Sequence, residues 1–421
     1  MLEALSKAIH KRKNAQNIVV VTDLGRDPDD EVFFLQLIGL SRLGLANIKG
    51  VIVNQTPLST RARLMKGMFN SFAAMDVTGH APLFNKAVRA QISALELDNI
   101  PVAMGTDGDA GHVLRPYEFN APYVQSVHAS DLQQSGQALL KTVCEKAAAD
   151  NQKITLMLIS AMQDADIFLY CNPDLFKAAI KDVVIMGGVE VNDNNELKRD
   201  ADGHVIPDLA SNNRFGHHLN RDPSNMVSDA ARRLYKELQL QNIPTTIVTR
   251  EAAYAVQVPP EYYSSLTASA HPTALRLEAM QKYMIHALLE DVLQYKDHPR
   301  LTPEWFAATY LHDPTQDLNA LLQNADDLMV QIKGFNLYDP LTAIANFFPK
   351  LFDPVALDNA QLNIIGASAA QNGIKNAEAI REILHYLPQV AFGRLPELEH
   401  GLSGYQNALS PQLDPKFNVF R

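Results

Sequence analysis

The sequence predicts an α/β fold with a mostly parallel open sheet flanked by helices. Over the first two-thirds of the 421 residues, short runs rich in β-branched residues alternate with helical stretches, which is the pattern of βαβ units. Hydrophobic residues make up 47% of the chain and charged residues 20%, so a large core can form and disorder is excluded. No fixed-period repeat or long Gly/Ser linker divides residues 1–421, which favours a single domain.

The expected elements follow in chain order. Strands are expected at 18–22 (IVVVT), 48–53 (IKGVIV), 100–104 (IPVAM), 154–159 (ITLMLI), 182–186 (DVVIM) and 244–249 (PTTIVT). Helices are expected at 31–43, 60–75, 135–149 and 172–180. From residue 272 onward long helical periodicity takes over, which predicts a helical insertion or cap at about 260–330 and a helical extension at about 351–421.

Charge and cysteine usage exclude several classes of protein. Thirty-seven Lys and Arg against 47 Asp and Glu give a net charge of −10, which argues against nucleic acid or an anionic membrane as a partner. Cys144 and Cys171 form no CxxC pair, so a cytoplasmic, reducing location fits best. No apolar run approaches the roughly 18 residues of a membrane span, and the N-terminal basic cluster follows the apolar residues, unlike in a signal peptide.

The loop after the first expected strand carries the strongest chemical signal. Residues 23–31 (DLGRDPDDE) hold five carboxylates in nine positions, at the edge where open α/β sheets bind ligands. A solvated turn that caps the next helix is one interpretation. However, aspartates that converge on one point repel each other unless a cation neutralises them. Their all-oxygen character favours Ca²⁺ or Mg²⁺ over zinc.

Other acid-rich or phosphate-binding motifs do not fit this loop. A phosphotransferase of the haloacid-dehalogenase type needs a second aspartate two residues after the first, where this chain has Gly25. An EF-hand needs alternating acidic residues and a Glu at its twelfth position, which are absent here. The sequence also contains no GxxxxGK[ST] run.

The segment strand-T-D-x-G-x-D-x-D-D-helix resembles the N-terminal aspartate motif of the inosine-uridine-preferring nucleoside hydrolase family, in a variant with two extra residues before the final Asp-Asp pair. Further matches occur in the family's order over about residues 17–350. They are Val53-Asn54, where the family has Gly-Asn, IPVAMG ending at Gly105, ITLMLISAMQD, VVIMGG ending at Gly188, and GFNLYDPLTA at 334–343. The resemblance implies a Rossmann-like three-layer fold.

The resemblance also implies a Ca²⁺ site and a reaction, in which an activated water attacks the anomeric carbon of a ribonucleoside. Asp23 would be a metal ligand and the general base, and Asp30 a bidentate ligand. Asp339 would complete the metal ligands from the far end of the sequence, and the main-chain carbonyl of Gln163 would add one more.

The implied contacts with the sugar come from Asp29 and Asn54. For a third contact the family places an asparagine after the MGG segment, which here corresponds to Asn212 or Asn213, with Asn225 as a competitor. These asparagines can equally serve only to form hydrogen bonds in turns.

The chain departs from the family where the leaving base would be activated. Tyr338 stands in place of a histidine, and it can stack on the base, donate its phenolic proton, or be the packed end of a strand. Arg26 and Asp27 either contact the ligand or pair with each other. Arg250 and Glu251 follow the expected strand at 244–249, at the edge where ligands bind, but a surface ion pair is at least as good an interpretation. His217-His218 suggests a solvated pair rather than a metal site.

Two functions remain from the sequence. The first is a Ca²⁺-dependent hydrolase of nucleosides or related N-ribosides, of the kind used in purine or pyrimidine salvage. The second is a ribose- or nucleotide-sensing protein that has kept the scaffold and lost turnover. The expected partner is a small nucleoside or riboside. The apolar residues of the helical stretch 272–296 suggest packing in the core. Apolar residues that this stretch leaves exposed would instead suggest a homo-oligomer, either a dimer or a tetramer.

Overall fold

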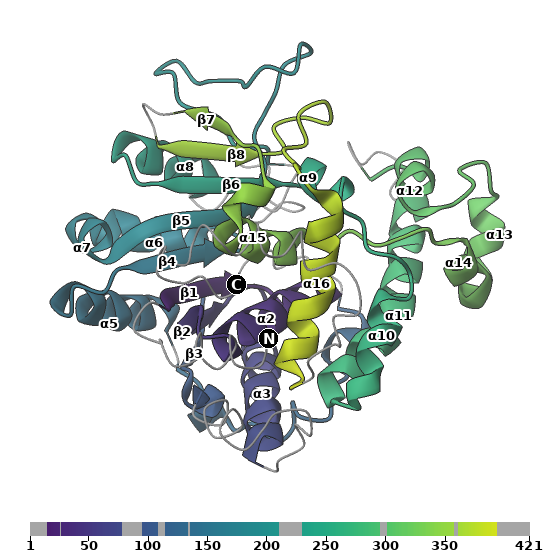
Figure 1. The fold of residues 1–421 in the computed structure, drawn as a ribbon, viewed down its shortest axis with the longest axis horizontal. Helices are drawn as coiled ribbons and strands as arrows, with labels where there is room; N and C mark the ends of the chain where they lie inside the picture. Colours follow the sequence, from purple (N-terminus) through teal and green to yellow (C-terminus); the bar gives the residue numbers. More distant parts are fainter. Residues whose placement is uncertain are drawn as a thin grey trace, which may run out of the picture.

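The structure is a computed structural model. It describes residues 15–25, 27–77, 95–107, 114–133, 135–209, 230–294, 301–357 and 361–393. An eight-stranded sheet with the order β3-β2-β1-β4-β5-β6-β8-β7 forms its centre (Figure 1). The strands are β1 (Gln16–Thr22), β2 (Ala46–Val53), β3 (Val102–Met104), β4 (Ile154–Leu158), β5 (Ile180–Gly187), β6 (Thr245–Thr249), β7 (Val355–Leu357) and β8 (Leu362–Ile365). All neighbouring pairs are parallel except β7 and β8, so the expected mostly parallel sheet is confirmed.

The central strands are apolar throughout because both faces of the sheet are covered. In β1, Ile18 and Val20 enter one hydrophobic core while Val19 and Val21 enter the other. Side chains alternate between the faces of a strand, so a strand buried on both sides reads as a continuous apolar run. The six expected strands are all present, with boundaries shifted by up to two residues.

Helices cover the two faces as separate layers (Figure 1). One face carries α2 (Pro28–Arg42), α3 (Leu58–Val77), α15 (Tyr338–Phe347) and α16 (Ala377–Ala391). The other carries α5 (Gly136–Ala149), α6 (Gln163–Cys171), α7 (Pro173–Ala179) and α8 (Ala230–Leu240). The three-layer arrangement is therefore confirmed. Among the described residues, no helix combines the length and the apolar character that crossing a membrane requires.

The C-terminal third supplies the expected helical insertion. It forms a lobe beside the sheet (Figure 1), built from α10 (Tyr262–Leu266), α11 (Pro272–Gln294), α12 (Pro303–Tyr310), α13 (Leu318–Leu322) and α14 (Ala325–Gln331). The short helix α9 (Arg250–Tyr254) leads from β6 toward it.

The expected helical extension at about 351–421 is only partly helical over its described residues, 351–357 and 361–393. Strands β7 and β8 lie in this segment and complete the sheet, ahead of α16. Both strands are short, and β8 is held by pairing with β6, which is distant in the sequence. Such pairing depends on tertiary context, so local periodicity does not reveal it.

The carboxyl ends of the parallel strands meet at one edge. Backbone N–H groups of Asn54, Gly105 and Ile159 donate to carbonyl oxygens of Thr22 (2.9 Å), Val53 (2.8 Å) and Val21 (3.0 Å), which aligns the loops after β1 to β4. The chain leaves β1 in one direction along the sheet and β4 in the other. Such a change of direction creates the crevice where open α/β sheets bind ligands.

Helix α16 crosses α2 at close range. The Gln36 amide donates to the Leu384 carbonyl, and Arg42 Nε donates to the Ala391 carbonyl, each at 2.9 Å. The approach is closest at Gly39, where a Cβ atom would lie 2.3 Å from the backbone oxygen of Leu387. Only glycine allows this contact.

We expect Gly39→Ala to lower the free energy of unfolding by about 1–3 kcal/mol, the range typical of overpacking. Denaturant titration measures this value. Gly50→Ala is the matched control, because its Cβ would meet only the flexible Leu139 side chain, at 3.1 Å. Equal stability of both variants would contradict the close packing of α16 on α2.

Candidate functional site

Three buried carboxylates form the centre of the candidate site. Asp29 and Asp30 lie in the first turn of α2, and Asp339 is the second residue of α15. Their oxygens approach within 4.8 Å of one another. The three residues are 7%, 5% and 5% exposed, so the interpretation of the loop as a solvated acidic turn is wrong. The packing of α15 against α2 brings together segments that are far apart in the sequence.

Burial and mutual repulsion disfavour the charged form of these carboxylates. The pKa of Asp29 is raised to about 8, first by burial and then by the charges of Asp27 and Asp23. Burial followed by neighbouring carboxylates raises the pKa of Asp30 and Asp339 well above the usual range. The Thr22 hydroxyl donates to Asp30, and the N-terminus of α2 also favours negative charge.

A hard divalent cation suits this set of ligands. All the converging atoms are carboxylate oxygens, which are the preferred ligands of Ca²⁺ and Mg²⁺. The second acidic group among the described residues is Asp200, Asp202 and His204. It is more exposed, and the Lys236 ammonium lies 2.6 Å from Asp202, which supplies a positive charge already. The buried group is therefore the better cation site.

Asp23 lies beside this group but is not one of its three members. It directly follows β1 and is half-buried. Its charge contributes to the raised pKa of Asp29, Asp30 and Asp339, which places it close enough to act electrostatically on all three. Asp27, four residues later, is exposed.

A buried arginine fixes the backbone at Asp23. The fully buried Arg61 donates through Nη1 to the carbonyl oxygens of Asp23 (2.6 Å) and Leu24 (2.7 Å). The next residue, Gly25, has φ +116°, and a Cβ there would lie 3.0 Å from the ring of Phe119. The turn thus needs both a glycine and a guanidinium.

The charge of Arg61 is balanced inside the protein. Glu118, also fully buried, lies 3.5 Å from Arg61 Nη2. Arg276 of α11 donates to the Glu118 backbone oxygen at 2.7 Å and pairs with Glu31 at 2.9 Å. This chain of buried charges connects the helical lobe to α2. Arg61, Glu118 and Arg276 could not be singled out from the sequence, because nothing local separates a buried arginine from a surface one.

Asn54 is held by a second buried network. It is fully buried after β2, and its Nδ2 donates to the Ala161 carbonyl (2.9 Å) and to Asp164 (3.2 Å). Asp164 lies in the first turn of α6 and also accepts from the Thr106 hydroxyl (2.8 Å). Asp164 was not singled out in the sequence, although it directly follows Gln163 in a matched segment.

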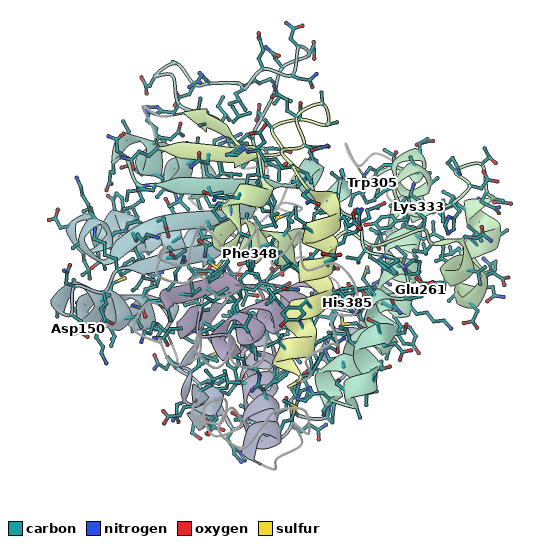
Figure 2. The ribbon with its side chains drawn as sticks, viewed as in Figure 1. Asp150, Glu261, Trp305, Lys333, Phe348 and His385 are labelled. Atoms are coloured by element: carbon teal, nitrogen blue, oxygen red, sulfur yellow. The ribbon has the colours of Figure 1, made fainter. Side chains whose placement is uncertain are left out.

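Tyr338 belongs to a cluster of aromatic side chains next to Asp339. It is the first residue of α15, so its interpretation as the end of a strand was wrong. Its ring lies 6.1 Å from that of Tyr254 of α9, and Trp305 Nε1 of α12 donates to the Tyr254 hydroxyl at 3.3 Å. Tyr310 of α12 hydrogen-bonds to Tyr338, and burial raises the pKa of Tyr310 to about 12. Figure 2 shows Trp305 on the helical lobe.

The remaining predicted residues have varied placements. Gln163 is half-buried and begins α6, where a loop was expected. Arg250 pairs with Glu251 at 3.3 Å, as one interpretation held, and additionally with Asp208 at 2.6 Å. Six residues named in the sequence analysis lie outside the described residues: Arg26, Asn212, Asn213, His217, His218 and Asn225.

Comparison with solved structures gives matches along nearly the whole chain. The type III effector protein XopQ, in complex with adenosine diphosphate ribose, aligns with a TM-score of 0.67 and 26% identity over 92% of this chain and 98% of its own. The effector protein XOO4466 aligns with a TM-score of 0.66 and 25% identity, over 93% and 98%. A purine-preferring ribonucleoside hydrolase from Gardnerella vaginalis aligns with a TM-score of 0.48 and 12% identity, over 89% and 99%.

No protein-family model and no curated protein matches the sequence. The chain shares its fold with the two effector proteins along almost their full lengths. The three-layer fold that the aspartate motif implied is confirmed by the sheet and by the helices on its two faces.

Removal of one clustered carboxylate should affect the metal-free and Ca²⁺-loaded proteins in opposite directions. In EDTA we expect Asp339→Asn to melt at or above the wild-type temperature, because one of three repelling groups is gone. With Ca²⁺ at about 100 times its Kd, the wild type should gain about 2.7 kcal/mol and the variant much less. Differential scanning calorimetry measures both. Asp174→Asn, at an exposed position of α7, is the control. An equal gain of stability on addition of Ca²⁺ in the wild type, Asp339→Asn and Asp174→Asn would exclude Asp339 from a cation site.

Proposed function

We propose that the chain is a divalent-cation-dependent N-ribohydrolase, which cleaves the N-glycosidic bond of a ribonucleoside or a related N-riboside. The buried group of Asp29, Asp30 and Asp339 beside Asp23 is the observation that carries this proposal. Its support is physical: a protein that only needed a stable fold would gain nothing from burying these carboxylates together. Concentrated negative charge is what a reaction that develops positive charge on a sugar requires.

Asp29, Asp30 and Asp339 would hold Ca²⁺, and the motif adds Asp23 and the Gln163 carbonyl as further ligands. Each carboxylate has two oxygens, so Asp29 can contact the ion and also a ribose hydroxyl. When bound, such an ion makes a water molecule more acidic and orients it. Asp23 accepts the proton as general base, because it is half-buried next to the group and its backbone is held by Arg61.

The sugar would be recognised by hydrogen-bond acceptors at the edge of the sheet. Asp29 lies in the first turn of α2 and Asn54 directly follows β2, and both carry oxygens that can accept from ribose hydroxyls. Cleavage of the N-glycosidic bond builds positive charge on the ribose, and the same carboxylates stabilise that charge.

The departing base would meet the aromatic cluster. Tyr338 directly precedes Asp339 in the sequence, and the ring of Tyr254 lies edge-on to the ring of Tyr338. Aromatic side chains offer a large apolar surface together with a polar group, which suits a planar heterocycle with a hydrogen-bonding edge. Tyr338 would orient the base and can donate its phenolic proton to it.

One observation favours a second candidate, a riboside-binding protein without turnover. XopQ, which aligns with this chain at 26% identity, was solved with adenosine diphosphate ribose. That ligand contains an N-riboside of adenine, so its binding to this chain can be measured directly. Tyr338 in the place of a family histidine also favours this candidate. The two candidates share the site and differ only in whether the bond is cleaved.

Asp23→Asn keeps the size of the side chain and removes the proton acceptor. We expect turnover to fall at least about a hundredfold, the scale of general-base loss, while riboside binding is largely retained. Release of free base measures turnover, and calorimetry measures binding. Asp27→Asn is the matched control, because Asp27 is exposed in the same loop. Unchanged turnover in Asp23→Asn together with a loss in Asp27→Asn would transfer the role of base to Asp27.

Ribosides should react much faster than deoxyribosides, because a missing hydroxyl leaves Asp29 or Asn54 buried without a partner. We expect a preference of at least about a hundredfold, measured as base release from adenosine, uridine, nicotinamide riboside and their deoxy counterparts. Binding of adenosine diphosphate ribose without base release from any compound would favour the second candidate. Equal rates on ribosides and deoxyribosides would contradict the role of Asp29.

A further inference from the structure

Asp164 connects three loops at the ligand-binding edge of the sheet. It is 1% exposed and lies beyond β4. Its carboxylate accepts from the Thr106 backbone N–H (3.1 Å) and hydroxyl (2.8 Å), after β3, and from Asn54 Nδ2 (3.2 Å), after β2. In the sheet, β1 lies between β4 and β2. Asp164 therefore reaches past the end of β1, the strand that leads to Asp23.

The loop after β3 is shaped around this carboxylate. A Cβ atom at Gly105 would lie 2.7 Å from Asp164 Oδ2 and 2.9 Å from Oδ1. The glycine thus permits the approach, and the next residue supplies the two hydrogen bonds from Thr106. The Gln137 amide also donates to the Asp164 backbone oxygen, at 2.9 Å. Asp164 is consequently fixed by contacts from several sides.

This arrangement determines which way the Asn54 amide points. Both acceptors around Nδ2, the Ala161 carbonyl and the Asp164 carboxylate, require the NH₂ group on that side. The reverse orientation would place Oδ1 against two acceptors. Asn54 Oδ1 is fully buried and has no hydrogen-bond partner among the residues that the structure describes. An unpaired buried acceptor is unfavourable by about 1–3 kcal/mol, so it is a strong candidate to receive a hydrogen bond from a ligand.

Asn54 also lies next to the carboxylate group. Its backbone N–H donates to the carbonyl oxygen of Thr22 at 2.9 Å, and the hydroxyl of the same Thr22 donates to Asp30. The unpaired amide oxygen therefore belongs to the same edge of the sheet as the candidate cation site.

We propose that Asp164 is a positioning residue that makes Asn54 a pure hydrogen-bond acceptor, and thereby selects ligands that present a hydroxyl group to it. Ligands with an ether, a phosphate or no substituent at that place are rejected, because none of them donates a hydrogen bond. The identity of the hydroxyl as a ribose hydroxyl rests on the proposed function, whereas the orientation of Asn54 does not.

The orientation can be tested without any ligand, by a thermal stability cycle of Asn54→Asp, Asp164→Asn and the double variant. Asn54→Asp places two carboxylates together, and Asp164→Asn removes the charge of the carboxylate that accepts from Asn54 Nδ2. The double variant restores a hydrogen bond of reversed polarity. We expect its melting temperature to lie several degrees above the value obtained by adding the shifts of the two single variants. This is the size of coupling seen for contacting residues. Strictly additive effects would overturn the proposed contact.

The effect on selection is tested by the affinities of adenosine, 2′-deoxyadenosine and 3′-deoxyadenosine. In Asp164→Asn the charged acceptor beside Asn54 Nδ2 is lost, and only the Ala161 carbonyl still holds the NH₂ group on that side. We therefore expect the preference for adenosine over at least one deoxy compound to fall about tenfold, roughly one hydrogen bond. Thr106→Val is the matched control, because it removes a bond to Asp164 without touching Asn54. Its preference should stay at the wild-type value.

The outcomes separate the two proposals. An unchanged preference in Asp164→Asn, or an equal fall in Thr106→Val, would overturn selection through Asn54 and leave Asp164 with a structural role only. A wild type that binds none of these compounds would contradict the proposed function instead. In that case the stability cycle still decides whether Asp164 orients Asn54.

Discussion

The repulsion among Asp29, Asp30 and Asp339 is the interaction on which the rest of the site depends. Burial of an ion costs several kcal/mol, and these three carboxylates lie within 4.8 Å of one another. The fold withstands this cost because α2 and α15 are held by hydrophobic packing on one face of a sheet whose other face is also covered. A bound cation converts the repulsion into binding free energy, so the same feature that weakens the metal-free protein creates the site.

The site divides into two parts with different origins. The edge of the sheet supplies oxygens that suit a cation and a sugar, and buried partners fix their positions: Arg61 holds the turn at Asp23, and Asp164 holds Asn54. The helical lobe supplies aromatic residues such as Trp305 and Tyr310. Arg276 connects these two parts through Glu31, the residue after Asp30. Under the proposed function, the chemistry belongs to the edge of the sheet. The choice of base belongs to Tyr338 and Tyr254, together with the lobe residues that contact them.

The sequence allowed much of this arrangement to be predicted, and the limits have physical causes. The six strands and the acidic loop were predictable because a buried parallel strand and its following loop are local patterns. Asp339 was predictable only through the family resemblance, since no local pattern connects it to α2. Arg61 and Asp164 were missed because their roles depend on burial and on partners from distant segments. Strand β8 was missed for the same reason, because its pairing with β6 is a long-range contact.

The most direct test of the account is to locate the cation in crystals of the protein grown with Mn²⁺, by its anomalous scattering. Mn²⁺ is a suitable probe because it shares the preference of Ca²⁺ and Mg²⁺ for carboxylate oxygens. We expect one strong peak at roughly 2.0–2.6 Å from oxygens of Asp29, Asp30 and Asp339. A peak at Asp200, Asp202 and His204 with none at the buried group would contradict it.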